Sequence, residues 1–135
     1  MTKGEAKDEY REVGENIRHW QQMRFVAMTV FMAVTAGLLA ALFQWKTNLT
    51  TVANTSIRVM GMLSVIVFWI QDERIVQYWQ HYSNRAKTLE EELSFQQYST
   101  TPRRNKIVTS GNAIRLLYFA FLVFWISTLV FYFQF

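Results

Sequence analysis

The stretch from Ser56 to about Tyr98 constrains the fold most, because it is apolar in its first part and amphipathic in the rest. It contains no proline, and no glycine after Gly61, so nothing in its sequence interrupts a helix. In its second part apolar residues recur three or four positions apart, close to a heptad spacing. We expect one long helix that crosses a bilayer and continues for about six turns into water.

Three uncharged runs predict three membrane spans. The first run, 25–43, nearly matches a hydrocarbon core of roughly 30 Å. The second run, Val59 to Ile70, would cover only about 18 Å, so its span is predicted at 52–70 and includes Arg58. We expect Arg58 either to reach the headgroups, or to line a water path or make a polar contact between helices. The third span is predicted at 115–135.

The composition agrees with apolar segments that alternate with charged ones. Of 135 residues, 51% are hydrophobic and 18% are charged, and the net charge is +4, which suits a single domain of residues 1–135. Because the basic residues flank the apolar runs, an anionic lipid surface is favoured over nucleic acid as the partner. The chain has no cysteine, which excludes disulfides, thiolate metal sites and thiol nucleophiles.

The distribution of Lys and Arg predicts the orientation. Five lie in the segment 1–24 and six between 72 and 113, whereas the first connecting loop has only Lys46. The positive-inside rule then places the N-terminus in the cytoplasm and the C-terminus outside, in what we expect to be a bacterial inner membrane. The basic loop at 99–113 is expected to bind anionic lipid headgroups through Arg103, Arg104 and Lys106.

The fold class predicted is an all-α membrane protein whose first two helices form a long antiparallel hairpin that extends into the cytosol. The hairpin joins a cytosolic helix at 1–24 to a helical extension at 71–98. If residues 25 and 70 share the inner boundary, partners at equal depth have numbers that sum to about 95. The stripes predicted to pack against each other are Tyr10, Val13, Ile17 and Trp20 on one helix, and Ile75, Tyr78, Tyr82 and Leu89 on the other.

Further candidates lie within or beside the spans. Small residues let helices approach closely in lipid, and the candidates for this packing are Ala33, Gly37, Ala41 and Gly61. Candidate pore-facing or interhelical polar residues are Arg58, Thr29, Thr35 and Ser64. The sequence Asp72-Glu73-Arg74 marks where the helix leaves the membrane, and it is also a candidate clamp between the two cytosolic helices. Candidate N-caps of the second helix are Asn54, Thr55 and Ser56.

The sequence contains no pattern typical of an enzyme. There is no glycine-rich phosphate loop, no HExxH and no serine elbow, so we expect no catalytic residue and no cofactor. The two histidines, His19 and His81, are expected at different depths with too few neighbouring ligands for a metal site.

The stretch GMLSVIVFWIQDER, followed by YWQHYSNRAKTLEEELSFQQYSTTP, resembles small uncharacterised bacterial multi-span membrane proteins. In these, a span ends in an aromatic residue and an acidic-x-Arg exit, and continues into a helix that ends in a Leu-Glu-Glu-x-Leu-like segment. Over about residues 10–102 the architecture also resembles the SLATT group. These are two-span proteins associated with nucleotide-signalled conflict systems and thought to perforate membranes when triggered. The third apolar run is additional to that pattern, and the resemblance transfers no functional residue.

We therefore expect a small integral membrane protein whose cytosolic hairpin mediates oligomerisation or binds a partner protein. One version of this hypothesis, implied by the resemblance, is a pore-forming effector of a bacterial conflict system. The alternative is a passive accessory or anchor subunit of a larger membrane complex.

Overall fold

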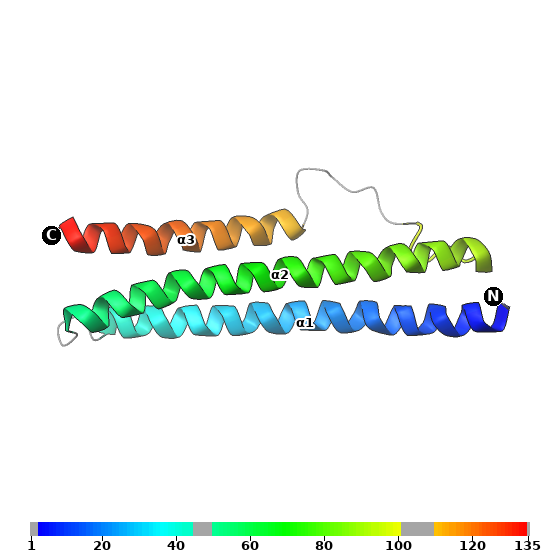
Figure 1. Cartoon of the computed structure of the whole chain (residues 1–135), viewed down its shortest axis with the longest axis horizontal. Helices are drawn as coiled ribbons and strands as arrows, with labels where there is room; N and C mark the ends of the chain where they lie inside the picture. The colour runs from blue at the N-terminus through cyan, green and yellow to red at the C-terminus, as the bar shows by residue number, and fades with distance from the viewer. Residues whose placement is uncertain (1–2, 45–49, 101–109, 135) are drawn as a thin grey trace. The chain divides into compact units, whose positions relative to one another are not determined.

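The computed structural model describes residues 3–44, 50–100 and 110–134, and the described residues form three α-helices and no strand (Figure 1). Helix α1 spans Lys3–Gln44, α2 spans Thr51–Leu93 and α3 spans Ser110–Gln134. The predicted all-α class is confirmed. Each of the three helices is long and apolar enough to cross a membrane, as judged by length and composition.

Helix α2 is continuous through Gln71, but its ends differ from the prediction. Its N-cap is Thr50, whose Oγ1 accepts a hydrogen bond from the N–H of Ala53 at 3.2 Å. The predicted caps at Asn54, Thr55 and Ser56 lie inside the helix instead.

At its other end α2 stops at Leu93, before the predicted limit at 98. Ser94 has a φ of 61°, in the left-handed region. The N–H of Phe95 then bonds to the carbonyl of Glu90 at 3.1 Å. This is the Schellman arrangement, which turns the chain away from the helix axis.

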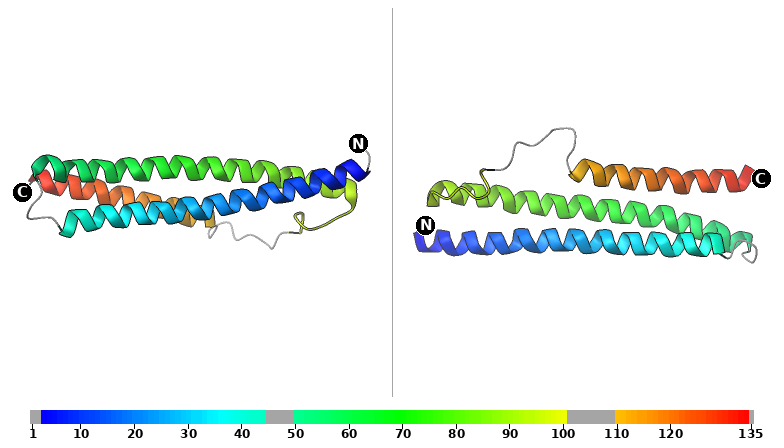
Figure 2. Two further views of the ribbon diagram at one scale, coloured as in Figure 1. Left: turned by 90° about the horizontal axis from the view of Figure 1, so that it is seen from below. Right: turned by 180° about the vertical axis from the view of Figure 1, so that it is seen from behind.

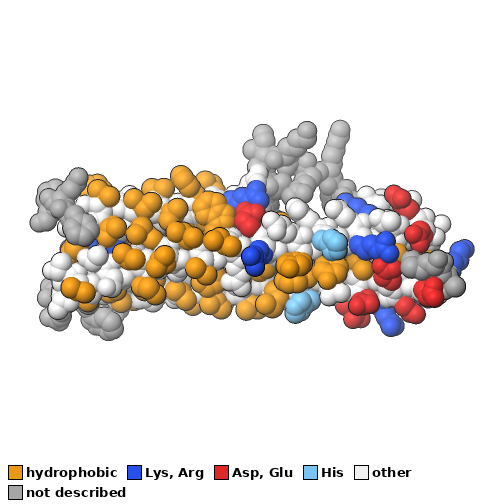
Figure 3. All heavy atoms as spheres, viewed as in Figure 1, with side chains coloured by type: hydrophobic (Ala, Val, Ile, Leu, Met, Phe, Trp, Pro, Cys, Tyr) orange, Lys and Arg blue, Asp and Glu red, His pale blue; other side chains and the backbone are white. Residues whose placement is uncertain are grey.

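The chain divides into two compact units. The polar unit comprises Met1–Val26 and Asp72–Lys106, and the apolar unit comprises Ala27–Gln71 and Ile107–Phe135. Helices α1 and α2 contribute to both units, and α3 belongs to the apolar one. On the face shown in Figure 3, most side chains of the apolar unit are hydrophobic, whereas the charged and histidine side chains gather mainly on the polar unit. The unit boundaries on α1 and α2, at 26/27 and 71/72, fall within about two residues of the places where the first two uncharged runs end.

In the polar unit α1 and α2 lie side by side (Figure 2) and bury one apolar seam. The core consists of Val13 and Ile17 of α1 with Ala86 and Leu89 of α2. Residue pairs run in opposite directions along the two helices, from Arg24–Asp72 through Trp20–Tyr78 to Glu9–Arg85. Burial of such a seam stabilises by roughly 25 cal/mol per Å² of apolar surface.

The pairing in this unit differs in detail from the predicted register. Trp20 stacks on Tyr78, where the prediction set it opposite Ile75. Arg85 bonds to Glu9, and the neighbouring Tyr10 bonds to Glu90. The reason is chemical. The hydroxyl of Tyr10 donates a hydrogen bond to the buried carboxylate of Glu90, and the guanidinium of Arg85 bonds to Glu9 instead.

In the apolar unit the three helices pack around Phe31, which is fully buried. Its ring centroid lies 5.5 Å from that of Phe68, 5.0 Å from Tyr118 and 5.4 Å from Phe121. Aromatic pairs at such distances stabilise helix packing by more than the apolar area that they bury. The outward surface carries large apolar side chains from every helix, among them Val30, Met60, Val67, Phe119 and Phe131.

Candidate functional site

Glu90 of α2 accepts several hydrogen bonds in the polar unit, and it is only 1% exposed. Its Oε1 accepts hydrogen bonds from the N–H of Gln97 at 2.8 Å, the N–H of Tyr98 at 2.6 Å and the hydroxyl of Tyr10 at 2.8 Å. Its Oε2 accepts one from the N–H of Ser99 at 2.8 Å. One carboxylate in the last turn of α2 therefore ties the following segment back onto both helices.

The electrostatics of this contact favour a charged Glu90 and a neutral Tyr10. Burial alone would raise the pKa of Glu90, but the hydrogen bonds from Tyr98, Tyr10 and Ser99 outweigh it and hold that pKa below its ordinary value. The pKa of Tyr10 is raised well above its ordinary value, first by burial and then by its hydrogen bond to Glu90 and the negative charge there. Both shifts strengthen the same pair across the neutral pH range.

Aromatic rings cluster around Tyr10, which bonds to the Glu90 carboxylate. The ring of Tyr10 lies 5.6 Å from that of Phe95 and 6.0 Å from that of Tyr98, measured between centroids. Gly14 on α1 lies beside this cluster: a Cβ there would lie 3.6 Å from the hydroxyl of Tyr98, which is an ordinary van der Waals contact. We name Tyr10, Glu90, Phe95 and Tyr98 the Glu90 knot.

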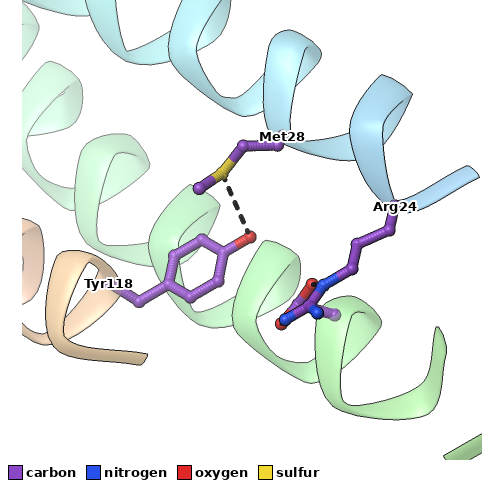
Figure 4. Close-up of polar contacts among 4 residues, drawn as sticks. Arg24, Met28 and Tyr118 are labelled. Carbon is purple, nitrogen blue, oxygen red and sulfur yellow. Dashed lines mark hydrogen bonds and ion pairs between the residues drawn. The ribbon is translucent and has the colours of Figure 1, made fainter. Parts of the chain in front are cut away.

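A second polar contact joins α1 to α2 where the uncharged runs end. The Arg24 guanidinium donates to both oxygens of Asp72, from Nε to Oδ1 at 2.8 Å and from Nη2 to Oδ2 at 3.0 Å (Figure 4). Asp72 is 5% exposed. A planar fork on a carboxylate is the strongest geometry that such a pair can adopt. Asp72 thus makes the clamp contact considered for the sequence 72–74, whereas Arg74 is exposed.

Arg58, in the apolar unit, is buried between α2 and α3. Its Nη1 donates to the carbonyl of Asn54 at 3.2 Å and also to the side-chain oxygen of Asn54. The guanidinium carbon sits 4.3 Å from the centre of the Tyr132 ring. The side chain therefore points toward the N-terminal end of its helix, as helical side chains do, and α3 covers it.

The other polar candidates have separate surroundings. Thr35 is buried, and its hydroxyl has no hydrogen-bond partner among the described residues. Ser64 donates to the carbonyl of Gly61 in its own helix at 2.8 Å. Thr29 is exposed. Within the described ranges, neither Thr35 nor Ser64 forms a hydrogen bond with Arg58.

The small residues proposed for helix packing differ in their surroundings. Gly61 is buried at the contact with α3, where a Cβ would overlap the indole of the fully buried Trp125. Ala33 and Gly37 of α1 are exposed, and a Cβ on Gly37 would meet nothing within 4 Å. Ala41 is half-buried. Gly61 therefore serves packing within the chain, while Ala33 and Gly37 face outward.

Tyr118 gives α3 a further polar contact in the same unit. It is 1% exposed, and its hydroxyl lies 4.0 Å from the sulfur of Met28 on α1 (Figure 4). The ring of Tyr118 also stacks near that of Trp69 on α2, at 6.3 Å. A single α3 side chain thus contacts both other helices.

The remaining candidates lie at the surface or outside the described residues. His19 and His81 are exposed, and each makes an edge contact with the aromatic residue that follows it, Trp20 or Tyr82. Over the described part of the chain, no group of three His, Cys, Asp or Glu side chains could hold a metal ion. The proposed lipid-headgroup residues Arg103, Arg104 and Lys106 lie outside the described residues.

Sequence reasoning does not find the Glu90 knot, because Glu90 is the first of three consecutive glutamates, a pattern typical of a solvated helix end. The helical spacing offers one signal: Glu90 follows Ala86, a residue of the buried seam, by four positions and so lies on the same face of α2. Its bonding partners in the segment after α2 carry no pattern that identifies them. Searches of protein-family models, curated proteins and solved structures found no match to this chain.

Proposed function

We propose that this chain is a small integral membrane protein with three spans, and that its polar unit is a cytosolic helical hairpin that mediates self-association or partner binding. The observation that carries the proposal is the change in outward surface along α1 and α2. Between Phe25 and Phe43, and between Val52 and Ile70, the exposed side chains are mostly large and apolar. Beyond the Arg24–Asp72 pair they are mostly polar or charged.

The polar unit is suited to binding because it is held in shape before a partner arrives. Its seam and the Glu90 knot fix the two helices against each other. A surface that is already ordered loses little conformational entropy on association. Two helices can bury only one seam between them, so each keeps an uncovered flank, and these flanks are the proposed interaction surface.

The hairpin can be tested in membranes because the chain has no cysteine of its own. Val13 and the ring of Tyr82 belong to one packed cluster. The variant with Val13→Cys and Tyr82→Cys should therefore crosslink within one chain. The control variant with Val13→Cys and Glu73→Cys should not, because position 73 lies about 13 Å from position 82 along the axis of α2. Failure of the first pair in membranes would contradict the hairpin.

Self-association is tested with one cysteine per chain on each exposed flank, at Glu12 of α1 or Asn84 of α2. We expect copy-to-copy crosslinks from at least one flank that persist when the membranes are diluted with added lipid. If neither position gives a product, self-association is wrong and the accessory or anchor alternative is preferred.

A second candidate is the pore-forming version, and Arg58 is the observation that favours it, because a charge within an apolar segment is costly and usually functional. In this chain Arg58 lies against Asn54 and Tyr132, so a pore would need several copies or a rearrangement of α3. Overexpression should then depolarise cells. Arg58→Ala should abolish the effect, and Arg58→Lys should retain part of it. No depolarisation by the unaltered chain would exclude the pore.

A further inference from the structure

An aromatic and basic surface of the polar unit lies near the point where the uncharged runs end. Trp20 and Tyr78 stack face to face, with ring centroids 4.7 Å apart and an angle of 7° between the planes, and Tyr78 is 52% exposed. An open groove beside them is lined by Arg74, Gln77, Tyr78, His81 and Tyr82. We name this groove, together with Trp20, the aromatic–basic groove.

The position of the groove along the helices can be estimated from the helical rise. Trp20 lies about 6 Å along α1 from Arg24, and Tyr78 lies about 9 Å along α2 from Asp72. Arg74 is closer, at about 3 Å. The headgroup layer of one leaflet is about 5–8 Å thick. If the spans end at the Arg24–Asp72 pair, these side chains lie in or beside that layer.

The chemistry of the groove suits that layer. Indole and phenol rings favour the membrane interface because each has an apolar body and a polar tip. The guanidinium of Arg74 can donate two parallel hydrogen bonds to a phosphate. The groove lining contains the cation Arg74 and no carboxylate, so its charge complements an anion.

We propose that the aromatic–basic groove docks the phosphate headgroups of anionic phospholipids in the cytoplasmic leaflet. This docking would set the depth at which the hairpin leaves the membrane. The inference rests on the proposed function, because it requires the spans to end at Arg24 and Asp72.

The test compares lipid selectivity in vesicles. The full chain is reconstituted in phosphatidylcholine with a trace of spin-labelled phosphatidylglycerol or spin-labelled phosphatidylcholine, and the motionally restricted fraction of each is measured. The unaltered chain should prefer phosphatidylglycerol. Arg74→Gln should lower this preference by up to about fivefold. The control Lys87→Gln makes the same charge change on an exposed site of α2, about 22 Å from Asp72, and should leave the preference unchanged.

A second measurement separates failure of this inference from failure of the proposed function. A nitroxide on Gln77→Cys should broaden the phosphorus resonance of the lipid headgroups, and one on Thr88→Cys should not. If neither label broadens the resonance, the polar unit does not adjoin the membrane and both proposals fail. If the label at position 77 broadens the resonance but Arg74→Gln and Lys87→Gln have the same lipid preference, only the headgroup site is overturned. The groove would then be interpreted as a surface for a protein partner.

Discussion

Two glycines in the apolar unit have opposite surroundings, and this gives a matched pair of substitutions. Gly61→Ala places a methyl group against the buried ring of Trp125, and neither side can move freely. Overpacking of this kind costs about 1–3 kcal/mol. Gly37→Ala meets open space and removes a flexible residue from a helix, so it should be neutral or stabilise by up to about 1 kcal/mol.

Thermal unfolding in detergent, followed by circular dichroism, measures both changes. We expect a lower midpoint for Gly61→Ala, and an unchanged or higher one for Gly37→Ala. Equal effects of the two substitutions would mean that α3 does not pack on Gly61.

The Glu90 knot predicts a specific dependence of stability on pH. The folded-state pKa of Glu90 is lowered, so its contribution is complete above the unfolded value of about 4.3 and is lost as the pH falls through the folded value. The pKa of Tyr10 is raised, so its contribution is complete below about 10 and is lost only at higher pH. The knot should therefore be strongest between these limits.

Glu90→Gln should destabilise the polar unit by about 2 kcal/mol at neutral pH, because an amide cannot accept all the hydrogen bonds that the carboxylate accepts. It should also flatten the loss of stability in acid. Exposed Glu91→Gln is the control and should do neither. Denaturant unfolding at about pH 3.5 and about pH 7 makes the comparison. If Glu90→Gln lost stability in acid as steeply as the unaltered chain, the role of the knot would be contradicted.

At the scale of the helices, the sequence predicted what depends on local pattern and failed where partners come from far away. The uncharged runs and the stripe through Val13, Ile17 and Leu89 are visible as periodicity, and the structure buries those residues. The end of α2 depends on the left-handed backbone conformation of Ser94, and a serine in the sequence does not predict that conformation. Asn54 resembles a cap, yet Thr50 takes that role and Asn54 bonds Arg58.

The Arg24–Asp72 pair should control how α1 and α2 meet. Asp72→Asn removes the negative charge that the two-bond contact with Arg24 requires, and it leaves the half-buried guanidinium of Arg24 unpaired. We expect this to lower the free energy of unfolding by about 3 kcal/mol. Exchange of the two residues, Arg24→Asp with Asp72→Arg, should recover part of this loss. Asp8→Asn, at an exposed site of α1, should have little effect. Thermal unfolding and crosslinking between positions 13 and 82 measure the loss in Asp72→Asn and its recovery in the exchanged variant. If the exchanged variant recovered no stability, a direct pair between the two residues would be contradicted.

At the scale of the whole molecule, the chain combines two units that are stabilised by different forces. The polar unit gains from removing its seam from water. The apolar unit has a fully buried centre at Phe31, Val65 and Trp125, and its outward side chains are also apolar, which is the surface expected of helices surrounded by lipid. Residue types alone therefore divide the chain, and the divisions fall near Arg24 and Asp72.

The central claim is that α1, α2 and α3 cross a bilayer with the polar unit on the cytoplasmic side. Single cysteines at Glu12, Thr51 and Val67 test it most directly, because all three positions are exposed and the chain has no other cysteine. A maleimide that cannot cross membranes should label position 12 only from the cytoplasmic side, position 51 only from the outside, and position 67 from neither. Labelling of positions 12 and 51 from the same side, or free labelling of position 67, would contradict the account.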